Sequence, residues 1–319
     1  MVTDMDAGRA DRSIVLLGVA SGYGAGNPAC QDGPAVLRAM GFLDDLAAAR
    51  DGFRWDEPIR LEGEQTPAPN PLYAVARIAA RLADRIAAHV RAGDFPLVIG
   101  GDHSCAIGTW SGVKQALGAD RLGLLWIDAH MDSHTFRSSP SRNIHGMPLA
   151  CLLGQGDPHL TRIAGAGPKL LPQDVCLIGV RSFERGEAEL LAKLGVRVYF
   201  MDEIRRHGMH EVFAEARQRV RAQTSGYGIS LDLDALDPAE EPGVGTPVPD
   251  GLWRAEVMDA LALAHCDEKL LALEIAEYNP YLDTRFATAR AIHDLCRSLC
   301  APCQPAASNS LSTKGRMPP

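Results

Sequence analysis

The sequence predicts a single α/β domain of three layers, in which helices cover both faces of a central, mostly parallel sheet. Short apolar runs alternate along the chain with amphipathic stretches, which is the order of elements in α/β proteins. The apolar runs are almost free of polar residues, as expected for strands that helices bury on both faces. Because no repeat or long linker divides the 319 residues, one domain is expected over residues 13–303.

Seven apolar runs are candidate strands, each short enough for a buried strand of a parallel sheet. They are residues 13–19, 96–100, 123–128, 175–180, 196–200, 227–232 and 270–275. Between the first two, residues 71–92 repeat apolar side chains at intervals of three and four, which predicts a helix. Residues 186–194 and 254–265 are shorter helices of the same kind.

The segments between these elements are predicted to be loops and tails. Residues 137–143 and 237–251 are rich in Ser, Pro or Gly and are expected to lie over one face of the domain. The glycine-rich residues 22–26 follow the first strand and are expected to border the functional site. Residues 1–12 and 304–319 have the composition of disordered tails.

Composition and charge exclude several classes of function. The formal net charge of −8 argues against a generic nucleic-acid or anionic-membrane surface and suits a small cationic ligand. The longest apolar runs end within about eight residues, which is too short for a membrane span. The first residues contain Asp4, Asp6 and Asp11 but no apolar core of a secretion signal, so a cytoplasmic protein is expected.

The eight cysteines do not resemble a disulfide framework in a chain of this length, and reduced thiols are expected. Cys296, Cys300 and Cys303 have the spacing of an iron–sulfur motif, and the last two have the spacing of a redox pair. Because the motif lies at the end of a predicted C-terminal helix beside a tail, Cys296 and Cys300 are interpreted as helix-face residues and Cys303 as part of the tail.

Acidic and histidine side chains follow three of the predicted strands. Gly100-Gly-Asp-His-Ser104, Asp128-Ala-His-Met-Asp132 and Ser230-Leu-Asp-Leu-Asp-Ala-Leu-Asp-Pro238 each begin where an apolar run ends. If these segments stay extended, alternation places Asp128, His130 and Asp132 on one side of the chain. A single Asp-x-Asp is often only a turn or a helix cap, but three such clusters at three strand ends favour a shared site.

Carboxylates packed this closely would repel one another in a cleft of low dielectric, and a cation resolves the conflict. Imidazole and carboxylate ligands without thiolate suit Mn, Fe, Zn or Mg. The number of carboxylates exceeds what one divalent ion normally uses, so two ions that share carboxylates are expected.

The three motifs resemble the signatures of the ureohydrolase superfamily, which contains the arginases and agmatinases, and they resemble bacterial arginases within it. The resemblance extends from about Ile14 to Leu299 in the correct order. It implies a single three-layer domain with an eight-stranded parallel sheet and a centre of two Mn²⁺ ions, with Co²⁺, Ni²⁺ or Fe²⁺ as alternatives. It also implies a homo-oligomer, either a trimer or a hexamer.

The resemblance assigns six metal ligands, two of them bridging. One ion would bind His103, Asp128, Asp132 and Asp232, and the other would bind Asp128, His130, Asp232 and Asp234. The implied reaction is the attack of a metal-activated hydroxide on a guanidinium carbon, which converts L-arginine to L-ornithine and urea. Asp132 would take the proton of the attacking water and deliver it to the leaving amine.

Further residues carry over from the same resemblance. His145, in Asn143-Ile-His-Gly-Met-Pro148, matches an acid/base histidine, and its side chain suits that role near neutral pH. Glu277 matches a glutamate that binds the substrate guanidinium by paired hydrogen bonds. As an alternative, Glu274 or Glu277 caps a turn before Pro280. Thr246 matches a site threonine near the histidine.

The residues expected at the far end of the substrate match the family pattern at two positions and depart from it at two others. Ser141 and Asn143 match a pair that binds an α-carboxylate, which favours an amino-acid substrate over agmatine. His134 replaces a usual asparagine, and Glu184 replaces an aspartate that helps to bind the α-amino group. Both changes keep a donor or a charge, but they leave the exact guanidino compound open.

Other functions remain as alternatives at this stage. Agmatinase, guanidinobutyrase and formimidoylglutamase activities belong to the same superfamily, and 4-guanidinobutyrate is a competitor because it keeps a carboxylate. A non-catalytic metal-binding homologue is less consistent with the sequence, since all six ligand positions, His145 and Glu277 are present. The partner expected in each case is a small guanidino or related molecule, with no nucleic acid and no membrane.

Overall fold

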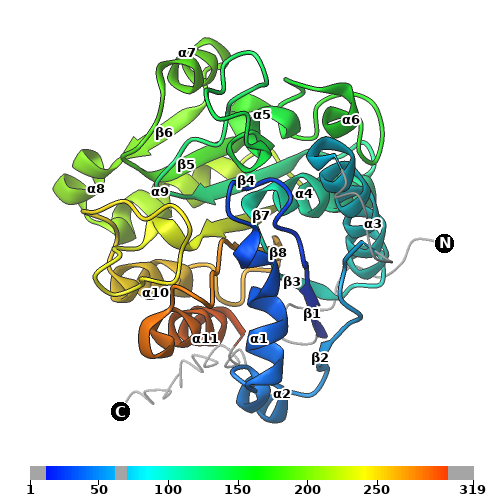
Figure 1. Ribbon diagram of the computed structural model, residues 1–319, viewed down its shortest axis with the longest axis vertical. Helices are drawn as coiled ribbons and strands as arrows, with labels where there is room; N and C mark the ends of the chain where they lie inside the picture. The colour runs from blue at the N-terminus through cyan, green and yellow to red at the C-terminus, as the bar shows by residue number, and fades with distance from the viewer. Residues whose placement is uncertain (1–11, 62–69, 301–319) are drawn as a thin grey trace, which may run out of the picture.

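The computed structural model describes residues 12–61 and 70–300, and its centre is one eight-stranded sheet (Figure 1). The strands follow the spatial order β2-β1-β3-β8-β7-β4-β5-β6, and every strand pair is parallel. Their bounds are β1 Ile14–Gly18, β2 Phe53–Trp55, β3 Phe95–Ile99, β4 Leu122–Ile127, β5 Val175–Val180, β6 Arg197–Phe200, β7 Gly226–Asp232 and β8 Leu270–Ala276. The predicted class, a single three-layer domain with a parallel sheet, is confirmed.

Helices cover both faces of this sheet. Their bounds are α1 Gly33–Ala39, α2 Asp44–Ala49, α3 Pro71–Arg91, α4 Ala106–Leu117, α5 Pro148–Leu152, α6 Pro158–Thr161, α7 Arg185–Leu194, α8 Met201–His207, α9 Met209–Arg221, α10 Arg254–Ala262 and α11 Ala287–Cys300. Side chains of α1, α2 and α8 to α11 pack into one hydrophobic core, and those of α3, α4, α5 and α7 pack into the other. The three predicted helices correspond to α3, α7 and α10.

Side chains alternate between the two faces of the sheet along each strand, so one strand contributes to both hydrophobic cores. In β1, Leu16 belongs to one core, whereas Val15 and Leu17 belong to the other. Each of these side chains is fully buried, and such burial contributes roughly 1.5–3 kcal/mol per residue. A strand that is apolar at every position is therefore explained by two covered faces.

Helix α3 shows how the sequence sets an element. Asn70 accepts a hydrogen bond from the Leu72 amide, and Pro71 occupies the first turn, so both signals start the helix here. The helix then packs closely on α4, because a Cβ atom at Gly108 would lie 2.7 Å from the Ala79 carbonyl oxygen. Glycine at this position lets the two backbones approach.

Strand β2 was not predicted. It has three residues, lies at the sheet edge beside β1 and exposes Arg54, so the run is too short and too polar to stand out in the sequence. Its position depends on pairing with β1, which is a non-local contact.

The strand order explains why distant motifs meet. The four central strands of the sheet are β3, β8, β7 and β4. Strands β3 and β4 are consecutive in the sequence, but β8 and β7 lie between them in the sheet. Because all strands are parallel, the segments that follow them leave from the same edge of the sheet. Ligands of parallel α/β sheets bind outside this carboxyl edge.

The cysteines follow the expectation with one exception. Four of the described cysteines, Cys30, Cys105, Cys151 and Cys176, are free and buried, and Cys296 is buried on α11. Cys266 is disulfide-bonded, so the expectation of reduced thiols is wrong for this residue. Its turn packs against the end of α11, where His265 Nδ1 lies 3.4 Å from the Leu299 carbonyl oxygen, and this proximity is not visible in the sequence.

Cys303, the side chain of Cys300 and most of the predicted tails lie outside the described residues, and the interpretations that rest on them stay predictions. None of the helices in the described part of the chain is long and apolar enough to cross a membrane.

Candidate metal and substrate site

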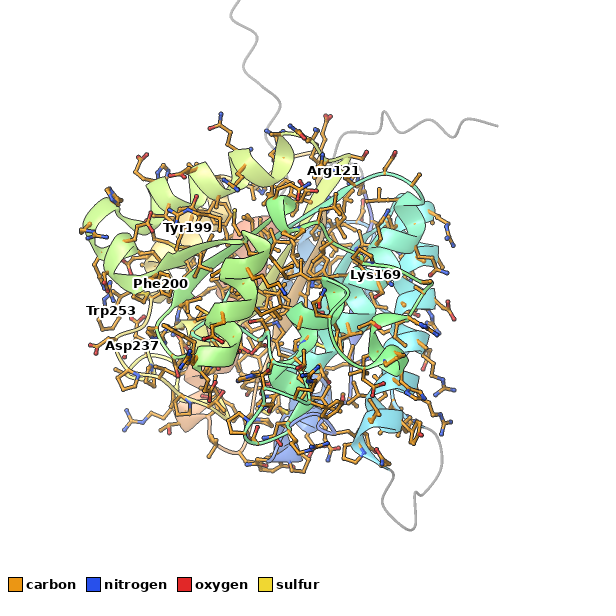
Figure 2. The ribbon with its side chains drawn as sticks, turned by 90° about the horizontal axis from the view of Figure 1, so that it is seen from above. Arg121, Lys169, Tyr199, Phe200, Asp237 and Trp253 are labelled. Carbon is orange, nitrogen blue, oxygen red and sulfur yellow. The ribbon has the colours of Figure 1, made fainter. Side chains whose placement is uncertain are left out.

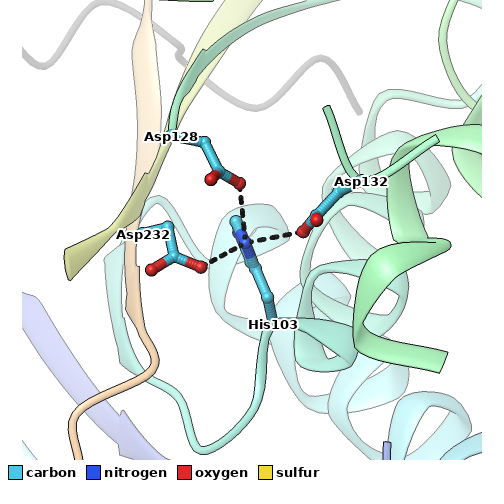
Figure 3. Close-up of side chains that lie close together, drawn as sticks. All are labelled: His103, Asp128, Asp132 and Asp232. Atoms are coloured by element: carbon cyan, nitrogen blue, oxygen red, sulfur yellow. Dashed lines mark ion pairs between the residues drawn. The ribbon is translucent and has the colours of Figure 1, made fainter. Parts of the chain in front are cut away.

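Three aspartate side chains surround one nitrogen atom of His103, and the four residues come from three chain segments (Figure 3). His103 Nδ1 lies 3.0 Å from an oxygen of Asp232, 3.1 Å from one of Asp132 and 3.3 Å from one of Asp128. His103 follows β3, Asp128 and Asp132 follow β4, and Asp232 ends β7. These four side chains form the first ligand group.

A second group shares Asp128 with the first. His130 Nδ1 lies 3.1 Å from Asp234 Oδ2 and 3.5 Å from Asp128 Oδ1. The other oxygen of Asp128, Oδ2, faces His103. One carboxylate therefore presents an oxygen to each histidine, as a bridging ligand does.

The chain brings these side chains together by turning, and the expected extended conformation is wrong beyond the strand ends. Asp132 has φ +46°, a left-handed conformation that aims its carboxylate back toward His103. Asp232 Oδ1 accepts a hydrogen bond from the Asp234 amide at 2.8 Å and starts the short 3₁₀ helix Leu233–Ala235. Asp232 thus faces the first group with its other oxygen only.

The loop before α4 is fixed in the same way. Asp102 caps the 3₁₀ helix His103–Cys105 by accepting from the Ser104 amide at 3.0 Å. Its second oxygen accepts from the Gly24 amide at 3.0 Å. The Gly24 carbonyl in turn accepts from the His145 amide, so the glycine-rich loop borders the site as predicted.

Burial and mutual repulsion perturb the carboxyl groups. Burial, with the Asp128 charge beside it, raises the pKa of Asp132 to about 6. Burial and the neighbouring Asp234 and Asp128 raise the pKa of Asp232 well above its ordinary value. The pKa of Asp128 is lowered instead, because its electrostatic interactions with the neighbouring His103 and His130 outweigh its burial. Buried carboxylates that repel one another are stabilised by a cation.

The donor set fits divalent metal ions. His103 is 1% exposed, and its Nδ1 makes no well-directed hydrogen bond in the described structure despite three surrounding oxygens. A buried lone pair that faces several carboxylate oxygens is the arrangement of a metal ligand. Two groups of nitrogen and oxygen donors, joined by Asp128, fit two ions, and no thiolate takes part.

His145 and Thr246 line the cavity beside the ligand groups and Glu277 does not, and all three have partners that the sequence did not show. Glu277 Oε1 accepts from the His103 amide at 2.8 Å and lies 3.0 Å from His145 Nδ1. Burial opposes a high pKa of His145, but the Glu277 carboxylate raises it to about 10. Thr246 donates to Asp234 Oδ2 at 2.8 Å and so contacts a ligand of the second group.

A cavity of about 340 Å³ opens above the two ligand groups. Its walls bring together the predicted far-end residues His134, Ser141, Asn143 and Glu184 with His130, Asp132, His145, Asp232, Asp234 and Thr246. Glu277 contacts His145 behind this wall. The size suits a small molecule, and most of the lining residues are polar.

His134 was expected to offer a free hydrogen-bond donor to the substrate, but its ring contacts other side chains. Its Nε2 lies 2.9 Å from Glu184 Oε2 and 3.4 Å from Glu187 Oε2, and its Nδ1 lies 3.1 Å from Ser138 Oγ. Both ring nitrogens therefore already have protein partners, and Glu184 is already engaged by His134.

Several site residues were missed by sequence reasoning. Glu187 is 3% exposed, lines the cavity and accepts from the Glu184 amide at 3.0 Å. The pattern Glu184-Arg-Gly-Glu187 at the start of a helix is a capping signal that would have identified it. Trp126 donates to Asp128 Oδ2 at 2.8 Å, but a tryptophan in an apolar strand gives no such signal.

Comparisons with known proteins agree with this geometry. The family model described as "Arginase family" matches residues 12–301. An arginase of Bacillus caldovelox is 41% identical over 90% of this chain and 98% of its own length, and one of Brevibacillus brevis is 39% identical over 91% and 98%. The crystal structure of a Bacillus subtilis arginase superposes with a TM-score of 0.84 at 36% identity, covering 91% of this chain and 99% of that one.

The parallel sheet and the paired groups of carboxylate and imidazole ligands define an α/β enzyme of the ureohydrolase class. With a family match across nearly the whole chain and relatives that align almost end to end, the protein belongs to the arginase family.

Proposed function

We propose that this protein is an arginase that hydrolyses the guanidinium group of L-arginine to L-ornithine and urea. The observation that carries the proposal is the pair of residue groups joined by Asp128 beside a cavity that His134, Ser141, Asn143 and Glu184 also line. The relatives named above, which are arginases, support the same reaction.

Two divalent ions, proposed to be Mn²⁺ with Co²⁺, Ni²⁺ or Fe²⁺ as alternatives, would be held by His103, Asp128, Asp132, Asp232, His130 and Asp234. When bound, they lower the pKa of a shared water and polarise the substrate. Nitrogen and oxygen ligands of this kind accept several first-row metals, so the identity of the ion is part of the proposal.

Asp132 and His145 would move the protons of the reaction. Asp132 lies in the first ligand group and also lines the cavity, so its carboxylate can take a proton from the attacking water. The leaving amine must gain that proton as its bond to the guanidinium carbon breaks. His145, held by Glu277, lines the same cavity and would exchange protons between the site and solvent.

Binding is assigned to both ends of the cavity. Glu277 is 2% exposed and would orient the guanidinium group, with Thr246 holding Asp234 beside it. At the far end, Ser141 and Asn143 would bind the α-carboxylate, and Glu184 with His134 would meet the α-amino group. Agmatine lacks the carboxylate and 4-guanidinobutyrate lacks the amine, so this end decides the substrate.

The test is urea release from L-arginine, agmatine and 4-guanidinobutyrate by protein reconstituted with Mn²⁺ after chelation. We expect a strong preference for L-arginine and its loss in Asp132→Asn, which keeps the shape of the side chain and removes the base. Equal or faster turnover of either shorter compound would reject the arginase assignment. No turnover of any of the three would point to formimidoyl substrates or to a non-catalytic role.

We also propose a cytoplasmic homo-oligomer, a trimer or hexamer. Phe183 and Trp253 are each 44% exposed and Phe200 is 37% exposed, and the rings of Phe183 and Phe200 lie 5.6 Å apart. Phe200 and Trp253 both lie toward the left edge of Figure 2. Clustered exposed aromatic side chains are typical of protein interfaces. Sedimentation analysis of the wild type and Trp253→Ser would detect such an assembly and its weakening.

A further inference from the structure

The face of His103 opposite the proposed metal centre carries a buried chain of hydrogen bonds. His103 Nε2 lies 3.0 Å from Ser230 Oγ, and Ser230 Oγ donates to Glu274 Oε1 at 2.8 Å. His103 and its two partners are at most 1% exposed. None of the ligand assignments above includes Ser230 or Glu274.

The sheet register creates this chain. Ser230 and Glu274 are paired across β7 and β8, so their side chains point to the same face. Strand β8 lies between β7 and β3, and His103 follows β3 directly. The neighbours of Glu274 in its strand, Leu273 and Ile275, are buried and apolar. A carboxyl group in such a strand is costly unless it has a specific partner.

A hydroxyl group has one proton, and this fixes the direction of the chain. Because Ser230 donates to Glu274, its oxygen accepts from His103, and the proton of the neutral imidazole then resides on Nε2. Nδ1 is left with its lone pair, and Nδ1 is the atom that faces Asp128, Asp132 and Asp232. A metal ligand needs this tautomer.

The ring is also held in orientation. Trp126 stacks on His103 with the ring centroids 4.3 Å apart and the planes 19° apart. The indole limits tilting of the imidazole, and the hydrogen bond at Nε2 limits its rotation in the plane. The two constraints act on different motions of the same ring.

We propose that Glu274, acting through Ser230, is a positioning residue that fixes the tautomer and orientation of His103 for metal binding. The inference rests on the proposed binuclear centre. It adds two residues that touch neither substrate nor metal and predicts an effect confined to the first ligand group. A purely structural role for Glu274, joining β7 to β8, would leave metal affinity unchanged.

Three variants separate these roles. Ser230→Ala removes the bridge, Glu274→Leu removes the acceptor, and Glu274→Gln keeps an acceptor oxygen without the charge. Outer partners of metal-ligating histidines typically change metal affinity by 10–100-fold, and we expect a loss of about this size for one of two Mn²⁺ ions in the first two variants. Glu274→Gln should remain within a few-fold of the wild type.

The first measurement is calorimetric titration of each metal-free protein with Mn²⁺. Ser111→Ala is the matched control, because Ser111 is equally buried on α4 and its hydroxyl has no hydrogen-bond partner in the described structure. Thermal unfolding of the metal-free proteins identifies any variant that does not fold. If Glu274→Leu does not fold, Ser230→Ala and Glu274→Gln still carry the test.

The second measurement is ¹⁵N NMR of histidine-labelled, Zn²⁺-loaded protein. In the wild type we expect two histidines, His103 and His130, with a proton on Nε2 and metal on Nδ1, and we expect only the His103 signal to change in Ser230→Ala. Unchanged Mn²⁺ affinity and an unchanged signal in Ser230→Ala would overturn the inference, as would equal losses in Glu274→Gln and Glu274→Leu. A wild type that binds no Mn²⁺ would instead reject the proposed function.

Discussion

His134 and Glu184 form a pair at the rim of the cavity, where the family resemblance implied two independent substrate contacts. The Glu184 side chain is 60% exposed, whereas that of His134 is only 7% exposed, so the imidazole holds the carboxylate at the cavity mouth. A carboxylate that already has a cationic or hydrogen-bonding partner attracts an α-ammonium group less strongly. This pair is therefore the feature most able to weaken the preference for an α-amino acid.

His134→Asn tests this interpretation, since it releases Glu184 and keeps a donor at the site. We expect kcat/KM for L-arginine relative to 4-guanidinobutyrate to rise several-fold.

Glu184→Gln should lower kcat/KM for L-arginine about 10-fold, because hydrogen bonds to charged groups contribute roughly 1.5–3 kcal/mol and this group is partly solvated. Steady-state urea release with both substrates measures the ratio. Equal losses on both compounds in Glu184→Gln would show that Glu184 does not contact the amine.

At the scale of the elements, Arg181, which follows β5, holds the connection after β7 by several hydrogen bonds. Arg181 donates to the carbonyl oxygens of Asp234 at 2.7 Å, Val248 at 2.8 Å, Ala235 at 3.1 Å and Pro249 at 3.1 Å. It joins the two ends of the long connection that carries Thr246. The position of Thr246 beside Asp234 therefore depends on a residue more than fifty positions earlier in the chain.

Arg181→Lys is expected to loosen this connection, because an ammonium group cannot reproduce several directed contacts of the planar guanidinium. We expect the free energy of unfolding to fall by about 2–3 kcal/mol, from several buried carbonyls that lose their donor. Urea denaturation provides the measurement. The control is Arg185→Lys, whose side chain is 90% exposed and should change stability by less than about 0.5 kcal/mol.

A second connection between elements lies beside β2, which is one edge strand of the sheet. Asp56, which follows β2, accepts from Arg85 of α3 at 2.6 Å and lies 2.9 Å from His89 Nε2. His89 Nδ1 lies 2.8 Å from Asp94, at the start of β3. Burial disfavours the ionised Asp56, but the hydrogen bonds from His89 and Arg85 outweigh it and lower its pKa to about 2.

This lowered pKa predicts a pH dependence of stability. A carboxyl group whose pKa is lower in the folded than in the unfolded state stabilises the fold above its unfolded pKa. The contribution should be complete above about pH 5 and should disappear as the pH falls through about 2. Its size is about 1–2 kcal/mol after allowance for partial exposure. Asp56→Asn should be less stable than the wild type at pH 6 and nearly equal at pH 2, as measured by chemical denaturation. A difference that persists at pH 2 would contradict this assignment.

At the scale of the whole molecule, the fold gathers acidic side chains at the centre of its parallel sheet. Asp128, Asp132, Asp232 and Asp234 are all at most 6% exposed, and they come from two strands that are adjacent in space. The two hydrophobic cores hold these strands in place through packing that does not involve the four carboxylates. The metal-free protein therefore carries an electrostatic cost that ion binding removes.

Metal binding is expected to stabilise the whole domain. A ligand at 100 times its Kd raises the free energy of unfolding by about 2.7 kcal/mol when it binds only the folded state. Thermal unfolding should therefore shift upward on addition of Mn²⁺ and downward on chelation. Asp128→Asn should reduce the shift, because Asp128 belongs to both ligand groups. A midpoint that does not respond to Mn²⁺ would contradict the metal assignment.

The sequence alone determined the class of fold and the chemistry of the site, because both are written in local patterns. Uniformly apolar runs are strands covered on two faces, and the segments Gly100–Ser104, 128–132 and 230–238 each carry acidic or histidine side chains within a few residues of a strand end. These patterns need no long-range information. The short edge strand β2 carries no such pattern, which is why it was missed.

The tertiary structure decided which of these residues meet and in what conformation. The left-handed turn at Asp132, the pairing of His134 with Glu184, and the chain from His103 through Ser230 to Glu274 all join groups that the sequence separates or leaves undirected. The physical reason is strand order. Hydrophobic packing of two helical layers places β8 and β7 between β3 and β4, and only this global arrangement brings Glu274 within reach of His103, which is more than 170 residues away.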